Sequence, residues 1–331
     1  MKLAVTDMHT GGEPVRIVTA GYPRIEGRTI LEKRAFAREH LDDLRKLLIF
    51  EPRGHFDMYG VLPVEPSLPG ADLAVLFIHN EGYSTMCGHA VIALGRWAVD
   101  TGLVAAQEPL TTVNIECPCG MVVASVEVKD GKAGAVSFES VPAFLFVADQ
   151  SIEIASGRSI RFDISYGGAF YALADARQWG LEFGKSPARA FVDAATELSD
   201  AVKAKYDIVH PDAADLGFLY GSILTDGGNG RDAPTKNVCV FADAEVDRSP
   251  TGSGVTARLA AMYAKGEIAL GEELTFESIV GSRFAGAVAR GTSAGNHRAI
   301  HARVAGRSFY SGKAEFWHEP DDELGRGFLL R

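Results

Sequence analysis

The chain has 331 residues, of which 47% are hydrophobic, and this is enough for a large core and for two domains of ordinary size. Its 43 acidic and 33 basic residues give a formal charge of −10. No run of Lys or Arg stands out that could follow a phosphate backbone, so we expect no nucleic-acid partner.

The ends and the cysteines indicate a compartment. The N-terminal segment turns polar by Thr6, too early for the apolar region of a signal peptide, and no apolar run approaches the length of a membrane span. We therefore expect a cytoplasmic protein with no membrane partner. Four cysteines, Cys87, Cys117, Cys119 and Cys239, are too few and too unevenly spaced for a disulfide scaffold, which favours reduced thiols.

Two segments have some features of a metal or cofactor site. Cys117 and Cys119 form a close pair, but a structural zinc site would need a matching second pair, which the sequence lacks. The glycines of DGGNGRD (Asp226–Asp232) have neither the Lys-Ser/Thr nor the helix start that a phosphate-binding loop requires. We expect no metal and no cofactor.

The predicted elements, in chain order, mix helices with short strands. Apolar periodicity predicts helices at about residues 30–48, 88–100, 187–206 and 252–265. Runs rich in β-branched and aromatic residues between turns predict strands at 74–79, 111–116, 121–129, 135–140 and from 160 to a turn at 168. The predicted class is mixed α/β (α+β) with antiparallel pairing. We expect an N-terminal domain of residues 1–148, joined by the tail 318–331, and a C-terminal domain of 149–317.

Two stretches of the chain resemble one another. Cys87–Ala93 (CGHAVIA) aligns without gaps with Thr251–Ala257 (TGSGVTA), sharing Gly, Val and Ala, and an apolar strand precedes each. Each copy has a polar side chain, then small residues, then an apolar segment typical of a buried helix. The pattern predicts two equivalent helix N-termini.

A helix N-terminus suits a particular chemistry. Its first turn leaves backbone N–H groups unpaired and carries a partial positive charge, so it can bind a carboxylate. The same field lowers a thiol pKa from about 8.5 toward neutrality, which would make Cys87 a thiolate base. Two such termini facing one another would place one reactive side chain on each face of a substrate, as racemisation without a cofactor requires.

Each of these residues also has a purely structural interpretation. Cys87 beside a glycine could be core packing, and His89 could be a satisfied polar group. Asp247 and Arg248 could form a turn that leads through a proline into the helix. Thr251 could serve only as an N-cap.

Five segments together carry a family resemblance that spans nearly the whole chain. They are DMHTGGEPVR (Asp7–Arg16), EPRGHFDMYG (Glu51–Gly60), MCGH (Met86–His89), DRSPTGSG (Asp247–Gly254) and ESIVGSRF (Glu277–Phe284). The chain resembles the proline racemase family, which includes hydroxyproline epimerases and trans-3-hydroxy-L-proline dehydratases. The resemblance implies two pseudo-symmetric domains of the diaminopimelate epimerase type, each a curved mixed sheet or barrel around a central helix, with the active site between them.

The resemblance also implies roles for the two repeated stretches. Gly88, His89, Gly252 and Ser253 would line the substrate, chiefly by donating backbone N–H groups to its carboxylate. Asp247 would face the ring nitrogen, with His89 nearby. The partner would be a proline-type amino acid, and the pattern leaves room for a homodimer.

One position departs from the racemase pattern. Racemases and 4-hydroxyproline epimerases have a second cysteine where this chain has Thr251. An alcohol is a weaker acid than the Tyr phenol, whose pKa is about 10, so Thr251 is poorly suited to exchange a proton with carbon. The Cys-plus-Thr pair resembles that of trans-3-hydroxy-L-proline dehydratases.

Stereochemistry independently favours a single base for that substrate. In trans-3-hydroxy-L-proline the hydroxyl lies on the same ring face as the Cα hydrogen. Cys87 could therefore remove the proton and protonate the departing hydroxyl, giving a pyrroline-2-carboxylate and water. Thr251 would cap its helix, hold the ring and block the opposite face. Two alternatives stay open: a hydroxyproline epimerase or proline racemase with a relay through Thr251, and a non-catalytic amino-acid binding protein.

Overall fold

The computed structural model describes residues 1–330, and the chain divides into two compact units. The first contains Met1–Val136 and the segment that begins at Arg307; the second is Ser137–Gly306. Both boundaries come earlier than we expected from the sequence. Strand pairing explains this: β9 (Ala143–Glu153) pairs with β10 of the second unit, and β18 (Ser308–Trp317) pairs with β1 of the first.

The first unit combines a strand system with three helices. Its strands are β1 (Lys2–Thr10), β2 (Glu13–Ala20), β3 (Gly60–Val64), β4 (Leu73–Ile78), β5 (Tyr83–Ser84), β6 (Leu110–Cys117), β7 (Gly120–Lys129) and β18, while β8 (Lys132–Glu139) crosses the boundary. Its helices are α1 (Ile30–His40), α2 (Asp42–Ile49) and α3 (Gly88–Asp100).

The second unit has the same kinds of element in a similar order. Its strands are β9, β10 (Ser159–Tyr166), β11 (Phe170–Asp175), β12 (Leu219–Thr225), β13 (Thr235–Phe241), β14 (Glu245–Asp247), β15 (Glu273–Glu277), β16 (Arg283–Ala294) and β17 (His297–Gly306). Its α-helices are α4 (Ala188–Lys205) and α5 (Gly252–Ala264), and short 3-10 turns lie at Ala176–Trp179 and Ala214–Leu216.

The two units share one pattern of strand pairing. β1–β2, β3–β4, β4–β5 and β6–β7 are antiparallel, whereas β2–β3 and β4–β6 are parallel. β10–β11, β12–β13, β13–β14 and β15–β16 are likewise antiparallel, and β11–β12 and β13–β15 are parallel. The internal repeat predicted from the sequence is therefore present in the topology.

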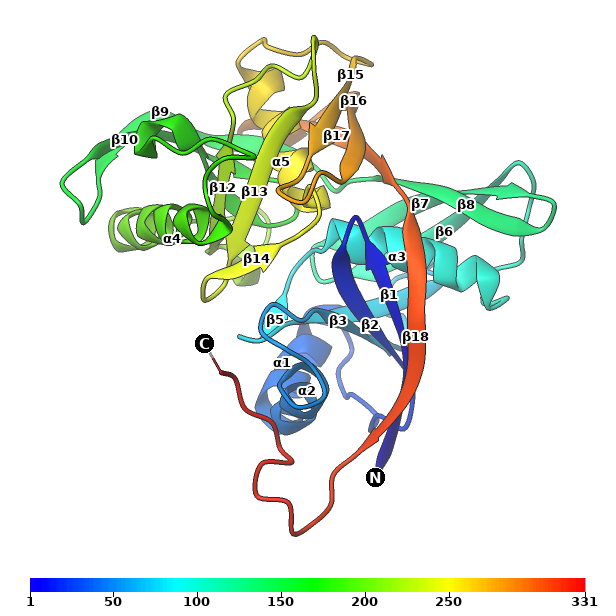
Figure 1. The fold of residues 1–331 in the computed structure, drawn as a ribbon. Coiled ribbons are helices and arrows are strands. Elements are labelled where there is room, and N and C mark those ends of the chain that lie inside the picture. The colour runs from blue at the N-terminus through cyan, green and yellow to red at the C-terminus, as the bar shows by residue number, and fades with distance from the viewer. Residues whose placement is uncertain (331) are drawn as a thin grey trace. The chain divides into compact units, whose positions relative to one another are not determined.

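A central helix occupies the same place in each unit. α3 follows the β4–β5 hairpin and packs against β1, β2, β6, β7 and β18, and α5 follows β13–β14 and packs against β9, β10, β11, β16 and β17 (Figure 1). In the second unit β17 pairs with β9, which closes the strands into a barrel around α5. Gly95 allows α3 to approach the strands, because a Cβ there would lie 2.9 Å from a methyl carbon of Val136. The predicted mixed α/β class is confirmed.

One helix prediction was wrong. The helix expected at residues 30–48 is two helices, α1 and α2, separated at Leu41, whose φ of −128° and ψ of 13° lie outside the helical region. The acidic pair Asp42 and Asp43 begins α2, where negative charge favours a helix start. Arg45 of α2 is in turn bound to the backbone after β4, which fixes the direction of the second helix.

Candidate active site

Cys87 lies directly before the first turn of α3. The β4–β5 hairpin leads into it, and its backbone is extended, with φ −146° and ψ 104°. Its side chain is buried and makes no capping hydrogen bond to the helix. Instead, Sγ lies 3.1 Å from Nδ1 of His89, within hydrogen-bonding distance for sulfur. The thiol therefore faces an imidazole rather than the backbone that it precedes.

The surroundings of His89 determine which ring nitrogen carries hydrogen. Nε2 lies 3.2 Å from the carbonyl oxygen of Pro14, which can only accept, so Nε2 is assigned as the N–H. Nδ1 is then the acceptor in the neutral ring and faces Cys87. Thr10 Oγ1 donates to the His89 carbonyl oxygen at 2.8 Å and holds the backbone of this residue. The geometry allows a proton to pass from the thiol to the imidazole.

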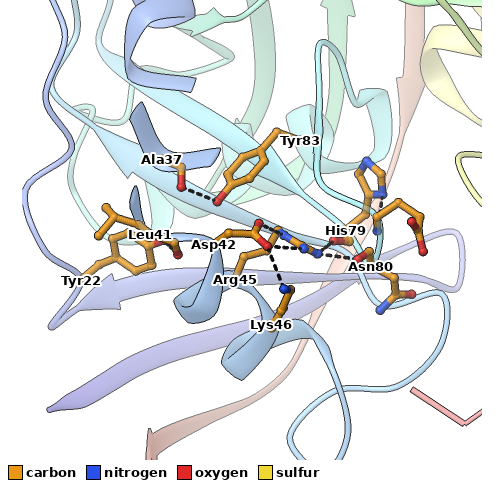
Figure 2. Close-up of polar contacts among 10 residues, drawn as sticks. Tyr22, Ala37, Leu41, Asp42, Arg45, Lys46, His79, Asn80 and Tyr83 are labelled. Atoms are coloured by element: carbon orange, nitrogen blue, oxygen red, sulfur yellow. Dashed lines mark hydrogen bonds and ion pairs between the residues drawn. The ribbon is translucent and has the colours of Figure 1, made fainter. Parts of the chain in front are cut away.

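The Tyr59 ring packs against the imidazole of the Cys87–His89 pair. The Tyr59 ring lies 5.0 Å from the His89 ring in an edge-on arrangement and 5.9 Å from the His79 ring, on which it stacks. The Tyr59 hydroxyl shares a short hydrogen bond with Ser84 Oγ, on β5 just before the cysteine. Figure 2 shows the next layer, in which Arg45 of α2 binds the carbonyl oxygen of His79.

The other two cysteines of this unit differ from Cys87 in ionisation. Burial raises the pKa of Cys119 to about 12. Burial also raises the pKa of Cys117 well above its usual value, and the nearby Cys119 and Cys87 add to this effect. Both stay thiols near neutral pH. Among residues 1–330, no group of three or more His, Cys, Asp or Glu side chains is arranged to hold a metal ion.

Thr251 occupies the corresponding position before α5, but its conformation is different. Its φ is +64° with ψ 96°, a region that a β-branched residue rarely adopts. Its hydroxyl is buried and has no hydrogen-bond partner within residues 1–330. The expectation that Thr251 caps its helix was wrong, because no helix N–H reaches Oγ1 in this backbone conformation.

The loop before Thr251 is tied by short-range hydrogen bonds. Asp247 Oδ1 accepts from the backbone N–H of Ser249 at 2.7 Å, and Ser249 Oγ accepts from the N–H of Thr251 at 3.0 Å. Asp247 is therefore part of a turn, as its structural interpretation predicted, and it is 4% exposed. The turn delivers the chain to Gly252 and the start of α5.

Gly252 and Ser253 form the first turn of α5. Ser253 Oγ shares a hydrogen bond of 2.7 Å with the Tyr171 hydroxyl on β11. Gly167, at the turn between β10 and β11, comes so close that a Cβ there would lie 2.2 Å from the carbonyl oxygen of Ser253. The first turn of this helix is thus fixed from its side by the neighbouring strands.

The structure gathers the predicted residues into two groups, one in each unit. The first is Cys87, Gly88 and His89, and the second is Asp247, Thr251, Gly252 and Ser253. Further residues contact these two groups or the turn before Thr251 and were not predicted from the sequence: Thr10, Pro14, Tyr59, Asn237 and Arg258. The first three lie in the segments DMHTGGEPVR and EPRGHFDMYG, which carry the family resemblance and could have pointed to them.

Comparison with known proteins identifies the family. The family model described as proline racemase matches residues 5–329. The chain belongs to the proline racemase family. A trans-L-3-hydroxyproline dehydratase from Saccoglossus kowalevskii is 55% identical over 326 residues, covering 98% of this chain and 100% of the relative. The trans-3-hydroxy-L-proline dehydratase of Homo sapiens is 52% identical over 338 residues, covering 99% and 95%.

A solved structure of a proline racemase relative extends the similarity to the fold. The hydroxyproline epimerase from Agrobacterium vitis, with bound trans-4-hydroxy-L-proline, has a TM-score of 0.93 and 30% identity, covering 99% of this chain and 96% of its own. The predicted resemblance to the proline racemase family is confirmed. In the described part of the chain, no helix is both long and apolar enough to cross a membrane.

Proposed function

We propose that this protein dehydrates trans-3-hydroxy-L-proline, with Cys87 as the group that takes the Cα proton. The observation that carries the proposal is the difference between the two equivalent helix starts. Cys87 has the imidazole of His89 at 3.1 Å, two residues further on. The residue two after Thr251 is Ser253, whose hydroxyl bonds to Tyr171. Only the first helix start therefore has a thiol next to a base.

The proposed reaction begins with proton transfer from Cys87 to Nδ1 of His89. The thiolate takes the Cα proton, so an S–H bond forms and the Cα–H bond breaks. The electron pair becomes the Cα–Cβ double bond as the bond from C3 to its hydroxyl breaks. The hydroxyl leaves on the same ring face with a proton from the Cys87 thiol. The products are a pyrroline-2-carboxylate and water, and the thiolate is regenerated.

The two helix starts would stabilise the charge that develops in this step. As Cα is deprotonated, negative charge spreads onto the substrate carboxylate, and backbone donors already in place stabilise it most effectively. We assign this role to the first turns of α3 and α5, at Gly88, His89, Gly252 and Ser253. Asp247 would face the ring nitrogen. Cys87 and Thr251 would both contact the substrate, Thr251 as a group that holds the ring without exchanging a proton.

The relatives support the substrate. Two of them, at 55% and 52% identity over almost the whole chain, have the name of a trans-3-hydroxyproline dehydratase. The structural relative from Agrobacterium vitis favours a second candidate, a hydroxyproline epimerase. Thr251 counts against that candidate, since an alcohol is a poor acid toward carbon. A binding protein without catalysis would not need a thiol against an imidazole.

One experiment separates the three candidates. The protein is incubated separately with trans-3-hydroxy-L-proline, trans-4-hydroxy-L-proline and L-proline, and products are followed by mass and by chiral chromatography. Loss of water from the first substrate alone supports the dehydratase. Inversion at Cα without loss of water would establish the epimerase or racemase instead, and absence of any turnover would leave the binding protein.

The expectations of a cytoplasmic location and of a homodimer stay predictions. Both are consistent with a small-molecule enzyme that needs no membrane or nucleic-acid partner. Fractionation of the cells that make the protein tests the first, and sedimentation of the purified chain tests the second.

A further inference from the structure

The backbone of Thr251 needs support from outside its own turn. A φ of +64° is strained for a β-branched residue, and such strain persists only where the surrounding structure holds it. The hydroxyl of Thr251 forms no hydrogen bond within the described residues that could provide this support. The preceding residue, Pro250, has no N–H, so its carbonyl oxygen is the polar backbone group of this residue that can form a hydrogen bond.

Asn237 of β13 forms a hydrogen bond with that oxygen. It is completely buried, and its Nδ2 donates to the Pro250 carbonyl oxygen at 3.0 Å. Its Oδ1 accepts from Nη1 of Arg258 at 2.9 Å. Because an arginine can only donate and a carbonyl can only accept, the two ends of this amide cannot be exchanged. Asn237 therefore links Arg258 in the interior of the barrel to the residue before Thr251.

Arg258 fixes the other end of the link. It projects from α5, is 6% exposed, and lies 4.9 Å over the ring of Phe276. Its Nη2 donates to Thr235 Oγ1 at 2.7 Å, and that hydroxyl donates to Asp226 Oδ1 at 3.0 Å. Burial lowers the pKa of Arg258 to about 10, although the negative charge of Asp226 acts in the opposite direction. A buried charge whose hydrogen bonds in residues 1–330 go to neutral oxygens is costly and calls for a reason.

We propose that Asn237 and Arg258 are positioning residues that hold Thr251 in its strained conformation at the substrate. The hydrogen bond to Pro250 fixes the peptide plane that precedes Thr251, and the arginine fixes the amide that makes this bond. The inference rests on the proposed function, in which Thr251 holds the ring and the first turn of α5 binds the carboxylate. A network that served only the stability of the barrel would have no effect on this backbone.

The variant Asn237→Asp separates the two ends of the link. An aspartate keeps an oxygen toward Arg258, now with a compensating charge, but has no donor for the Pro250 carbonyl. We expect an unchanged or raised Tm, together with a kcat lowered about tenfold to a hundredfold, because a small misplacement of a group that positions the substrate can cost this much. The matched control is Ser222→Ala, which removes a buried hydrogen bond of 2.7 Å to Ser199 in the same unit. It should lower Tm, because a buried hydrogen bond is lost, and leave kcat within about twofold, because this bond joins β12 to α4 and involves none of the residues assigned to the site.

A second background tests whether the effect passes through Thr251. Glycine adopts a positive φ without strain, so in Thr251→Gly the support from Asn237 becomes redundant. Asn237→Asp should then cost at most about threefold in that background, a non-additivity expected of coupled residues. An equal loss in both backgrounds, or no loss in the native one, would overturn the proposal. So would a crystal structure of Asn237→Asp in which φ of Thr251 is unchanged.

The outcome is distinguishable from failure of the proposed function. Activity is recorded both as water loss and as deuterium exchange at Cα. A native protein that exchanges or inverts Cα without losing water would end the dehydratase proposal, while the effect of Asn237→Asp on exchange and on φ of Thr251 would still decide the role of Asn237.

Discussion

Nδ1 of His89 lies 3.1 Å from Sγ of Cys87, on a ring whose other nitrogen is committed to the Pro14 carbonyl oxygen. The imidazole is therefore oriented to take the thiol proton. We predict that His89→Gln lowers kcat by about a hundredfold or more, within the range for loss of a general base. The variant should regain activity as the pH rises through about 8.5, where an ordinary thiol ionises.

The control is His40→Gln, at the exposed end of α1, which should leave the rate and its pH profile unchanged. Steady-state rates between pH 6 and 10 provide the measurement. A His89→Gln protein with the native pH profile would show that His89 does not ionise Cys87.

Cys87 should be the reactive thiol and the essential one. Cys87→Ser should abolish turnover while keeping Tm, because serine is small and is itself a favourable residue before a helix. Iodoacetamide at pH 7.5 should label Cys87 ahead of Cys117 and Cys119. The pKa of Cys119 is raised to about 12 and that of Cys117 well above its usual value, so both stay neutral thiols at this pH. Peptide mass spectrometry locates the label, and preferential labelling of Cys119 would contradict the assignment.

Thr251→Cys should gain epimerase activity. A substrate without a 3-hydroxyl, such as trans-4-hydroxy-L-proline, can lose its Cα proton to Cys87 but has no leaving group, so the native protein can only return a proton to the same face. A thiol at position 251 could donate from the opposite face, at a rate limited by its alignment. Chiral chromatography measures the inversion. Efficient inversion by the native protein would contradict the single-base mechanism.

Asp42 and Arg45 should stabilise the first unit in a pH-dependent way (Figure 2). Burial alone would raise the pKa of Asp42, but Arg45 and Lys46 outweigh burial and leave the pKa lowered. Arg45 donates hydrogen bonds of 2.6 and 2.9 Å to the two carboxylate oxygens, and both residues contribute positive charge. A lowered folded pKa gives stability that is present above the unfolded value of about 3.9 and is lost as the pH falls. Asp42→Asn should therefore lower the free energy of unfolding by about 1–3 kcal/mol at pH 7, because it leaves Arg45 buried without its counter-charge.

That deficit should shrink as the pH falls below about 4, because the carboxylate of the unfolded chain then takes up a proton while the folded carboxylate, whose pKa is lowered, stays ionised to lower pH. Urea unfolding at pH 7 and at pH 3.5 measures it. Asp193→Asn, which removes an exposed pair with Arg189 at 2.7 Å, is the control and should change stability by less than about 0.5 kcal/mol. A deficit that is the same at both pH values would contradict the ionic origin.

Chelating agents should leave the rate unchanged, because we assign no metal to the reaction. The test is prolonged dialysis against EDTA, followed by assay with and without added Zn²⁺. A loss of activity that zinc restores would overturn this assignment.

The order of residues along the chain was enough to predict the two helix starts and the family. CGHAVIA and TGSGVTA place a polar residue, small residues and an apolar helix in a local order, and α3 and α5 begin where this order predicts. Local periodicity is enough for such features because a helix start depends on neighbouring residues. The substitution of threonine for the expected second cysteine was also visible without any structure.

The contacts that hold those side chains are seen only in the folded chain. Pro14 and Thr10 reach His89 across 75 and 79 residues of chain, so no local pattern shows that the imidazole is oriented toward Cys87. The positive φ of Thr251 removes the capping bond that its position predicted. The domain boundaries follow from β9 and β18 pairing with strands of the unit they enter. Such pairings depend on the closure of long loops and on packing, which residue order at any one site does not specify.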